Sequence, residues 1–211
     1  EKGVDAVVVT PESLTNLAAI AAVLGSGGET LDLCEAEITE ITPVGMGHRV
    51  CVDTLSRFVA GQGMLVGNSA AFTFLVNAET EHNAYVASRP FRVNAGAVHA
   101  YALMPGDRTR YLEDLRAGDE VLVVNHQGGT ESAVIGRVKV EKRPMLLVRA
   151  AMKDGTEGAV FLQNAETICL VRPGGSPVSV VSLKPGDAVL CRKDTAGRHF
   201  GIRITEDISE E

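Results

Sequence analysis

The sequence predicts an α+β protein that is mainly antiparallel β, with two related, barrel-like β modules after a short strand–helix segment. Short runs of alternating apolar and polar residues follow one another from residue 31 onward, as in half-exposed strands. Turn-forming residues separate these runs, in a chain with 22 glycines and 8 prolines. Helical spacing occurs only near the start, and two segments that are well separated along the chain share one pattern.

The segment from Glu1 to Gly25 is typical of one strand–helix unit. Residues 4–9 form a mostly apolar run, and Thr10, Pro11 and Glu12 then supply an N-cap, a first helical proline and an acid in the first turn. Apolar residues at helical spacing follow, and Gly25 ends the helix. A parallel sheet needs more such units and none follows, so we expect residues 1–43 to be the end of an upstream α/β segment of a longer polypeptide.

Residues 44–211 are expected to form a β-rich domain, because the strand pattern continues through them and no long helical pattern interrupts it. The expected strands, including one that precedes this domain, span residues 34–39, 49–54, 72–77, 97–104, 120–125, 134–141, 145–150, 159–163, 167–171, 188–191 and 200–205.

An internal repeat joins residues 97–122 to residues 165–190 without a gap. The two segments share a strand, a Pro-Gly turn and the pattern Leu-x-x-Gly-Asp-x-Val-Leu. Two unrelated hairpins with common turn chemistry could also produce this pattern. We infer two related β modules packed with pseudo-two-fold symmetry.

Composition excludes several classes of protein. The 20 basic and 27 acidic side chains give a net charge of -7, which argues against nucleic-acid and membrane-surface partners. The longest uncharged stretch, residues 58–78, contains three glycines and several polar residues, so it is a poor membrane span. The four cysteines form no C-x-x-C pair, as expected of reduced thiols. We therefore expect a soluble, cytoplasmic protein.

Positive charge gathers in the middle of the chain, where residues 89–116 hold five basic and three acidic side chains. Arg89 and Arg92 could grip a carboxylate or phosphate, since a guanidinium offers a planar fork of donors. His99 and Tyr101 would share one face of the expected strand that follows. This pattern favours the wall of an anion pocket over an exposed strand with surface arginines.

A second set of polar residues could bind a metal. Glu79 and Glu166 lie at strand ends, and with His99 and His199 they would make a ligand set suited to Mn²⁺, Fe²⁺ or Zn²⁺. Their spacing carries no local signature, so unrelated surface residues are the alternative. The glycines at 45–47 and 61–67 lead into no helix, so they do not indicate a dinucleotide site.

Several uncommon sequence words resemble the 3-dehydroquinate synthase II family. They are residues 44–54, 63–67, 89–96, 98–101, 118–122, 136–139, 142–144, 162–168 and 198–201. The resemblance is collinear from end to end, and family members are larger, so the chain is similar to their C-terminal portion. It implies an enzyme that closes a linear seven-carbon 2-amino-hept-6-ulosonate into a six-membered ring.

The resemblance implies two activities within the family. One is NAD-dependent oxidative deamination with cyclisation to 3-dehydroquinate, and the other is metal-dependent formation of 3-amino-4-hydroxybenzoate from a phosphorylated C7 compound. His48, Leu55, Asn77 and Ala97 depart from the residues expected for the first activity, namely Asp, Cys, His and Pro. We therefore favour the 3-amino-4-hydroxybenzoate branch, with Mn as the expected metal and NAD only if the other branch holds.

These expectations give each candidate residue a role. Glu79, His99, Glu166 and His199 would hold the metal, and Arg89, Arg92, Asn94, Gln163 and Asn164 would bind substrate. His48, His99, Tyr101 and Lys139 would be the catalytic groups, which carry protons. The substrate would be a small C7 amino-keto acid, and the protein could form a homodimer. A non-catalytic β module that binds an organic anion, or a purely structural β repeat, is the alternative from another class.

Overall fold

The computed structural model describes residues 30–82, 87–194, 197–199 and 201–204. The expected strand at residues 4–9 and helix at residues 11–24 lie outside these ranges. The described residues form β1 (Cys34–Thr54), β2 (Gln62–Ser69), β3 (Phe72–Asn77), β4 (Arg92–Ala97), β5 (Tyr101–Met104), β6 (Arg108–Tyr111), the 3-10 helix η2 (Leu112–Asp114), β7 (Glu120–Asn125), β8 (Thr130–Ala151), β9 (Glu157–Gln163), β10 (Cys169–Val171), β11 (Pro177–Ser179), β12 (Ala188–Lys193), β13 (Gly197–His199) and β14 (Ile202–Ile204). All strand pairs of these residues are antiparallel, which confirms the mainly antiparallel-β prediction.

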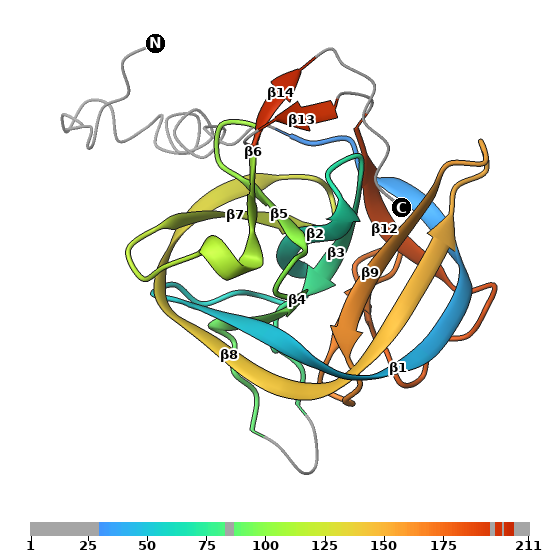
Figure 1. The fold of residues 1–211 in the computed structure, drawn as a ribbon, viewed down its shortest axis with the longest axis horizontal. Coiled ribbons are helices and arrows are strands. Elements are labelled where there is room, and N and C mark those ends of the chain that lie inside the picture. Colours follow the sequence, from blue (N-terminus) through green and yellow to red (C-terminus); the bar gives the residue numbers. More distant parts are fainter. Residues whose placement is uncertain (1–29, 83–86, 195–196, 200, 205–211) are drawn as a thin grey trace, which may run out of the picture.

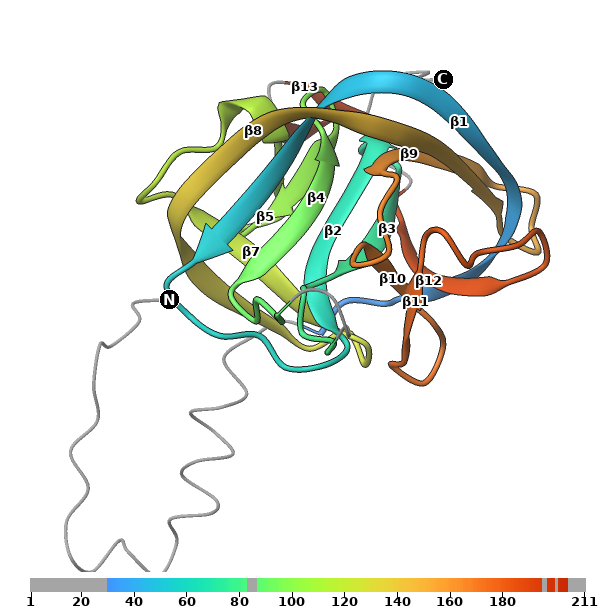
Figure 2. The ribbon, with the colours of Figure 1, turned by 90° about the horizontal axis from the view of Figure 1, so that it is seen from below.

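Six strands close a ring. The hydrogen-bonded order is β3-β12-β1-β8-β7-β2, and β2 pairs with β3 to complete it. The strands β5 and β6 extend the sheet from β2, β10 and β11 extend it from β3, and β4 and β9 pair with β1 and β8. Figure 1 shows β1 and β8 as two long, curved ribbons running side by side, and Figure 2 shows them arching over the shorter strands.

The two halves of this ring carry the same local structure. β7 pairs with β8, whereas β12, the counterpart of β7 in the internal repeat, pairs with β1. At the start of β7 the Gly118 N–H bonds Ile135 O at 2.8 Å, and at the start of β12 the Gly186 N–H bonds Ile38 O at 2.9 Å. Both glycines have a positive φ, near 90°, which an L side chain rarely adopts. The strand β7, which ends the first half, therefore pairs with the long strand β8 of the second half, and β12, which ends the second half, pairs with the long strand β1 of the first.

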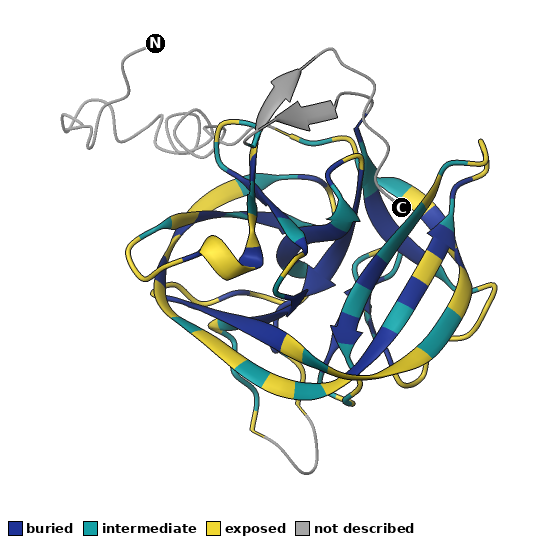
Figure 3. Cartoon of the chain, in the orientation of Figure 1, coloured by how far each residue is buried: buried dark blue, intermediate teal, exposed yellow. Residues whose placement is uncertain are grey.

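The core fills the inside of the ring. Strands contribute alternate residues to it, and Val50, Val66, Phe74 and Val148 are fully or almost fully buried. Figure 3 shows the buried residues along the inner strands, while β1 and β8 alternate between buried and exposed positions. Burial of apolar surface is therefore the main stabilising contribution of the ring.

Several expected elements differ from the structure. The expected strands at 34–39 and 49–54 are one strand, β1, and those at 134–141 and 145–150 are one strand, β8. The expected boundary between residues 43 and 44 falls inside β1, which pairs with β8 on both sides of it. The sequence does not predict the strand β2, because glycines interrupt the alternation of apolar and polar residues there, although most of β2 is buried. No described helix is long and apolar enough to cross a membrane.

Candidate functional site

A charged face covers the outer side of three neighbouring strands. Val50 and Val52 of β1 point into the core, so the residues between and beside them lie on the opposite face. Residues paired in register with them on β4 and β8 share that face. We define the charged face as Arg49, Cys51, Asp53, Arg92, Asn94, Arg137, Lys139, Glu141 and Arg143. Its five cationic side chains exceed its two carboxylates, which gives it a net charge of +3.

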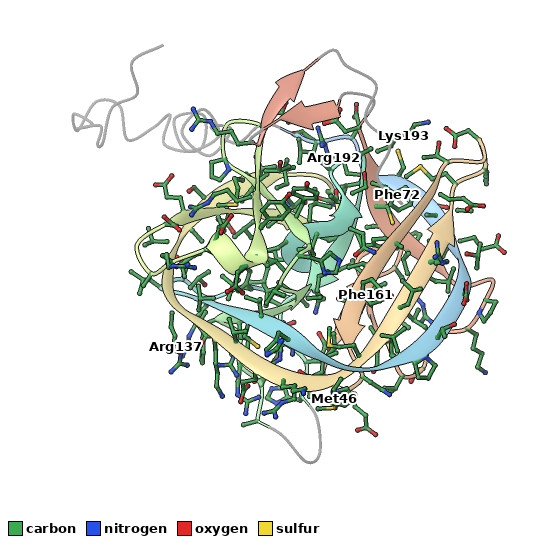
Figure 4. The ribbon with its side chains drawn as sticks, in the orientation of Figure 1. Met46, Phe72, Arg137, Phe161, Arg192 and Lys193 are labelled. Atoms are coloured by element: carbon green, nitrogen blue, oxygen red, sulfur yellow. The ribbon has the colours of Figure 1, made fainter. Side chains whose placement is uncertain are left out.

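Asp53 organises one end of this face. Its Oδ1 accepts Arg92 Nε at 2.6 Å and its Oδ2 accepts Arg92 Nη2 at 2.9 Å, while Arg137 Nε donates to Oδ2 at 2.8 Å. Burial acts to raise the pKa of Asp53, but the hydrogen bonds from Arg92 and Arg137 outweigh it and hold this pKa below its ordinary value. Figure 4 shows Arg137 on the outer side of β8. Arg92 is thus fixed in one orientation, while the Arg137 side chain is 63% exposed.

Glu141 organises the other end. Its carboxylate accepts Arg49 Nη2 at 2.8 Å, Arg143 Nη2 at 2.8 Å and Lys139 Nζ at 3.1 Å. The hydrogen bond from Lys139 and the charges of the two arginines lower the pKa of Glu141. Three cations share one carboxylate, so this end of the face has surplus positive charge.

Cys51 lies between these two ends. Arg49 Nη1 lies 2.5 Å from Cys51 Sγ, and Asn94 is the register partner of Cys51 on β4. Burial raises the pKa of the Cys51 thiol to about 11, although the charges of Arg49 and Arg92 lower it, so the thiol is neutral near pH 7. Asn94 Nδ2 donates to Gln163 Oε1 at 2.9 Å, which brings the end of β9 to the same place.

Four of the predicted residues therefore meet at the charged face: Arg92, Asn94, Gln163 and Lys139. Asn164 follows Gln163 and is exposed, and its N–H bonds the Pro144 carbonyl oxygen.

Glu79 connects the face with a neighbouring pocket. Its N–H donates to Arg92 O at 2.8 Å, and its Oε2 accepts Arg89 Nη1 at 3.2 Å. The pocket has a volume of about 230 Å³, and its lining includes Glu79, Glu81, His82 and Glu166. The predicted residues Arg89, Glu79 and Glu166 thus lie at or beside this acidic pocket.

The predicted histidines lie elsewhere. His48 and His99 line another pocket, of about 320 Å³, together with Met46, Met145 and Phe161. His99 Nε2 lies 3.3 Å from Asn68 Oδ1, its ring contacts Phe161 edge-on, and burial lowers its pKa. Figure 4 labels Met46, from β1, and Phe161, from β9, which are two of the residues that line this pocket.

The prediction that His99 and Tyr101 share one face of a strand is wrong. The chain turns after β4, and His99 lies in that turn, before β5 begins at Tyr101. Gly96, with a φ of 140°, and Ala97 end β4 there. The Tyr101 hydroxyl instead lies 2.9 Å from that of Tyr111, and their rings stack.

Of the three expected metal ligands whose side chains the structure describes, it brings only two together. Glu79 and Glu166 line one pocket and His99 lines another, while the side chain of His199 lies outside the described residues. Nowhere in the described ranges do three or more His, Cys, Asp or Glu side chains gather as a metal would require. Those ranges also contain no strand–glycine loop–helix unit for a dinucleotide.

Reasoning from the sequence missed Arg49, Cys51, Asp53, Arg137, Glu141 and Arg143. A signal for them was present, since polar residues alternate with Val50 and Val52 in one segment and with Val138 and Val140 in another. The sequence does not predict that these two segments pair with each other, because they are far apart along the chain.

Comparison with known proteins supports the family resemblance that the sequence motifs indicate. The family model described as 3-dehydroquinate synthase II C-terminal domain matches residues 35–211. The chain is 51% identical over its whole length to the 3-dehydroquinate synthase of Archaeoglobus fulgidus, of which it covers 64%. It is 52% identical to that of Methanococcus maripaludis strain C5, of which it covers 58%, and 49% identical to the 3-dehydroquinate synthase homolog of Aquifex aeolicus, of which it covers 63%.

No solved structure matches the chain significantly. The chain spans about three fifths of the length of these curated relatives, and the family model covers most of it. This chain belongs to the 3-dehydroquinate synthase II family.

Proposed function

We propose that this chain is part of an enzyme that closes a linear C7 2-amino-hept-6-ulosonate into a six-membered ring, and that the charged face binds the substrate. The observation that carries the proposal is the net charge of +3 on one sheet face that also holds buried polar groups. An organic acid would be attracted there, because five cations outnumber two carboxylates. Arg92, with Arg89 nearby, would orient the substrate carboxylate, since Asp53 already fixes the Arg92 guanidinium.

Ring closure requires removal of a proton from the carbon next to the ketone. Lys139 and Glu141 are a titratable pair on the charged face, with Nζ and Oε1 3.1 Å apart. The Glu141 carboxylate would accept the proton from that carbon, and the Lys139 ammonium, which is 47% exposed, would stabilise the enolate oxygen that forms. Asn94 and Gln163 would bind the hydroxyl groups of the substrate through their amides.

The product we propose is 3-dehydroquinate, which the names of the relatives support. That reaction also removes the amino group oxidatively, and NAD would supply the hydride acceptor when bound. The alternative product, 3-amino-4-hydroxybenzoate, is favoured by the departures at His48 and Asn77. His48 is exposed at the pocket with His99, and Asn77 is buried at the end of β3, so neither belongs to the charged face.

Incubation of the full-length protein with the C7 substrates, with and without NAD, tests this proposal, with mass spectrometry as the readout. We expect NAD-dependent release of ammonia and formation of 3-dehydroquinate from 2-amino-3,7-dideoxy-hept-6-ulosonate. An amino-aromatic product formed without NAD would establish the 3-amino-4-hydroxybenzoate branch instead. Recovery of both substrates unchanged would favour an anion-binding module without catalysis.

A further inference from the structure

Arg49 is a buried arginine with one donor left unused. Its side chain is only 6% exposed. Nη2 donates to Glu141 at 2.8 Å and Nη1 contacts Cys51 Sγ at 2.5 Å, but the buried Nε has no hydrogen-bond partner among the described residues. A buried donor without a partner is destabilising, so native structures seldom leave one.

An unused acceptor lies on the other side of Cys51. Asn94 is 3% exposed, and its buried Oδ1 has no hydrogen-bond partner in the part of the chain that the structure describes, while its Nδ2 is bound to Gln163. Asn94 is the register partner of Cys51, and the Arg49 guanidinium contacts the Cys51 thiol, so both unused atoms belong to groups that flank one residue. An unpaired donor and an unpaired acceptor therefore border the centre of the charged face.

We propose that Arg49 is a further substrate-binding residue, whose Nε donates to an oxygen of the substrate while Asn94 Oδ1 accepts a hydrogen bond from the same end of that molecule. The inference rests on the proposed function and names the part of the substrate that is held. The matching chemistry is a carboxylate or ketone oxygen beside a hydroxyl or ammonium group, as in an amino acid head group or a hydroxy ketone. The neutral Cys51 thiol between them adds no charge that would repel a carboxylate.

Three substitutions of Arg49 separate its Nε–H from its charge. Arg49→Gln places an amide nitrogen at the position of Nε but removes the charge and both terminal nitrogens. Arg49→Met places a methyl group there and removes the same ion pair. Arg49→Lys keeps the charge but has a methylene at that position. Gln and Met thus form a matched pair that differs in the donor under test.

The measurement is the Kd of 2-amino-3,7-dideoxy-hept-6-ulosonate for the full-length protein, by calorimetry without NAD. We expect Arg49→Met and Arg49→Lys to weaken binding by about 10- to 100-fold, and Arg49→Gln to bind about 5-fold more tightly than Arg49→Met. Arg149→Lys, at an exposed arginine that pairs with Glu40 outside the charged face, is the control and should change the Kd less than 3-fold, which is roughly the effect of an exposed ion pair.

Equal Kd values for the Gln and Met variants, with wild-type circular dichroism spectra, would overturn the role of Nε. If neither variant folds, Asn94→Leu decides instead: an unchanged Kd overturns the inference, and a weakening of about 10-fold supports it. Wild-type binding without ring closure would reject the proposed function, while the Gln-to-Met ratio would still decide the role of Arg49. Absence of binding by the wild-type protein would overturn both.

Discussion

Asp119 and Asp187 hold the two turns of the internal repeat in the same way. Asp119 Oδ2 accepts the Arg116 N–H at 2.7 Å, and Asp187 Oδ2 accepts the Lys184 N–H at 2.9 Å. The carbonyl oxygen of Asp119 accepts the Ile135 N–H, and that of Asp187 accepts the Ile38 N–H. Each aspartate thus closes a turn with its side chain and joins that turn to a long strand with its backbone.

Loss of either carboxylate should therefore have a similar effect on stability. We expect Asp119→Ala and Asp187→Ala each to lower the free energy of unfolding by about 1 kcal/mol, and the double variant by about the sum, since the two turns share no partner among the described residues. Asn substitutions, which keep an acceptor oxygen, should have smaller effects. Urea unfolding of the two single Ala variants, the double Ala variant and the two Asn variants measures these effects. A loss of stability in the double variant that differs greatly from the sum of the single losses would argue against two independent turns.

The repeat in these turns can be seen in the sequence because turn chemistry restricts which residues fit. Gly118 and Gly186 need a positive φ, and the aspartates need a short side chain with an acceptor. The long strands β1 and β8 occupy equivalent places in the ring, yet when Ile38 is aligned with Ile135 the only other identity along them is Ala36 with Ala133. Many different side chains fit on the surface of a strand, so the equivalence of β1 and β8 is hardly visible in the sequence.

Asp53 should be far more important to stability than an exposed aspartate in an ion pair. It is 4% exposed and binds Arg92 and Arg137, so Asp53→Asn leaves the Arg92 charge poorly compensated. We expect a loss of about 3 kcal/mol in the free energy of unfolding at pH 7. Asp154→Asn, which breaks the exposed pair with Lys193, is the matched control and should leave the stability nearly unchanged. Equal effects of the two substitutions would show that the Asp53 cluster contributes little.

The effect of Asp53 should also depend on pH in one direction. Its pKa is lower in the folded protein than the ordinary value of 3.8, so its contribution is complete above that value and is lost as the pH falls through the folded pKa. The difference in stability between wild type and Asp53→Asn should therefore be constant from pH 5 to 7 and shrink below about pH 4. Urea unfolding at several pH values checks this, and a difference that grows on acidification would contradict it.

The candidate site could be predicted only in part. The sequence predicts Arg92 and Asn94 because both lie in one short segment around the two arginines. The contacts of Asp53 and Arg49 instead depend on the pairing of β1 with β4 and β8. The expected strand through His99 failed because β4 ends in a turn at Ala97, and the histidine then faces a different pocket. Local pattern predicts which residues are polar and which are buried, whereas long-range register decides which of them meet.

Gly63 should tolerate no side chain, because strands β2 and β3 approach closely there. A Cβ at Gly63 would lie 1.8 Å from the Val76 carbonyl oxygen, which is backbone and cannot move aside. We expect Gly63→Ala to lower the free energy of unfolding by about 3 kcal/mol or more, or to prevent folding. Gly47→Ala is the control, since its Cβ would meet only the Met145 side chain, at 3.0 Å, and should cost about 1 kcal/mol. Thermal unfolding by circular dichroism compares them, and a Gly63→Ala protein as stable as Gly47→Ala would contradict the close approach.

The four cysteines should react with thiol reagents at two different rates. Cys34 is half-buried, whereas Cys51, Cys169 and Cys191 are buried. Burial raises the pKa of the Cys51 and Cys169 thiols to about 11 and raises that of Cys191 well above its ordinary value, so the reactive thiolate is scarce at all three. With excess Ellman's reagent at pH 7.5, one thiol should react quickly and three slowly, and Cys34→Ser should remove the fast phase. In guanidinium chloride all four should react quickly, because unfolding exposes them. A fast phase that survives in Cys34→Ser would mean that one of the three buried thiols is accessible, and single Ser substitutions at those positions would identify it.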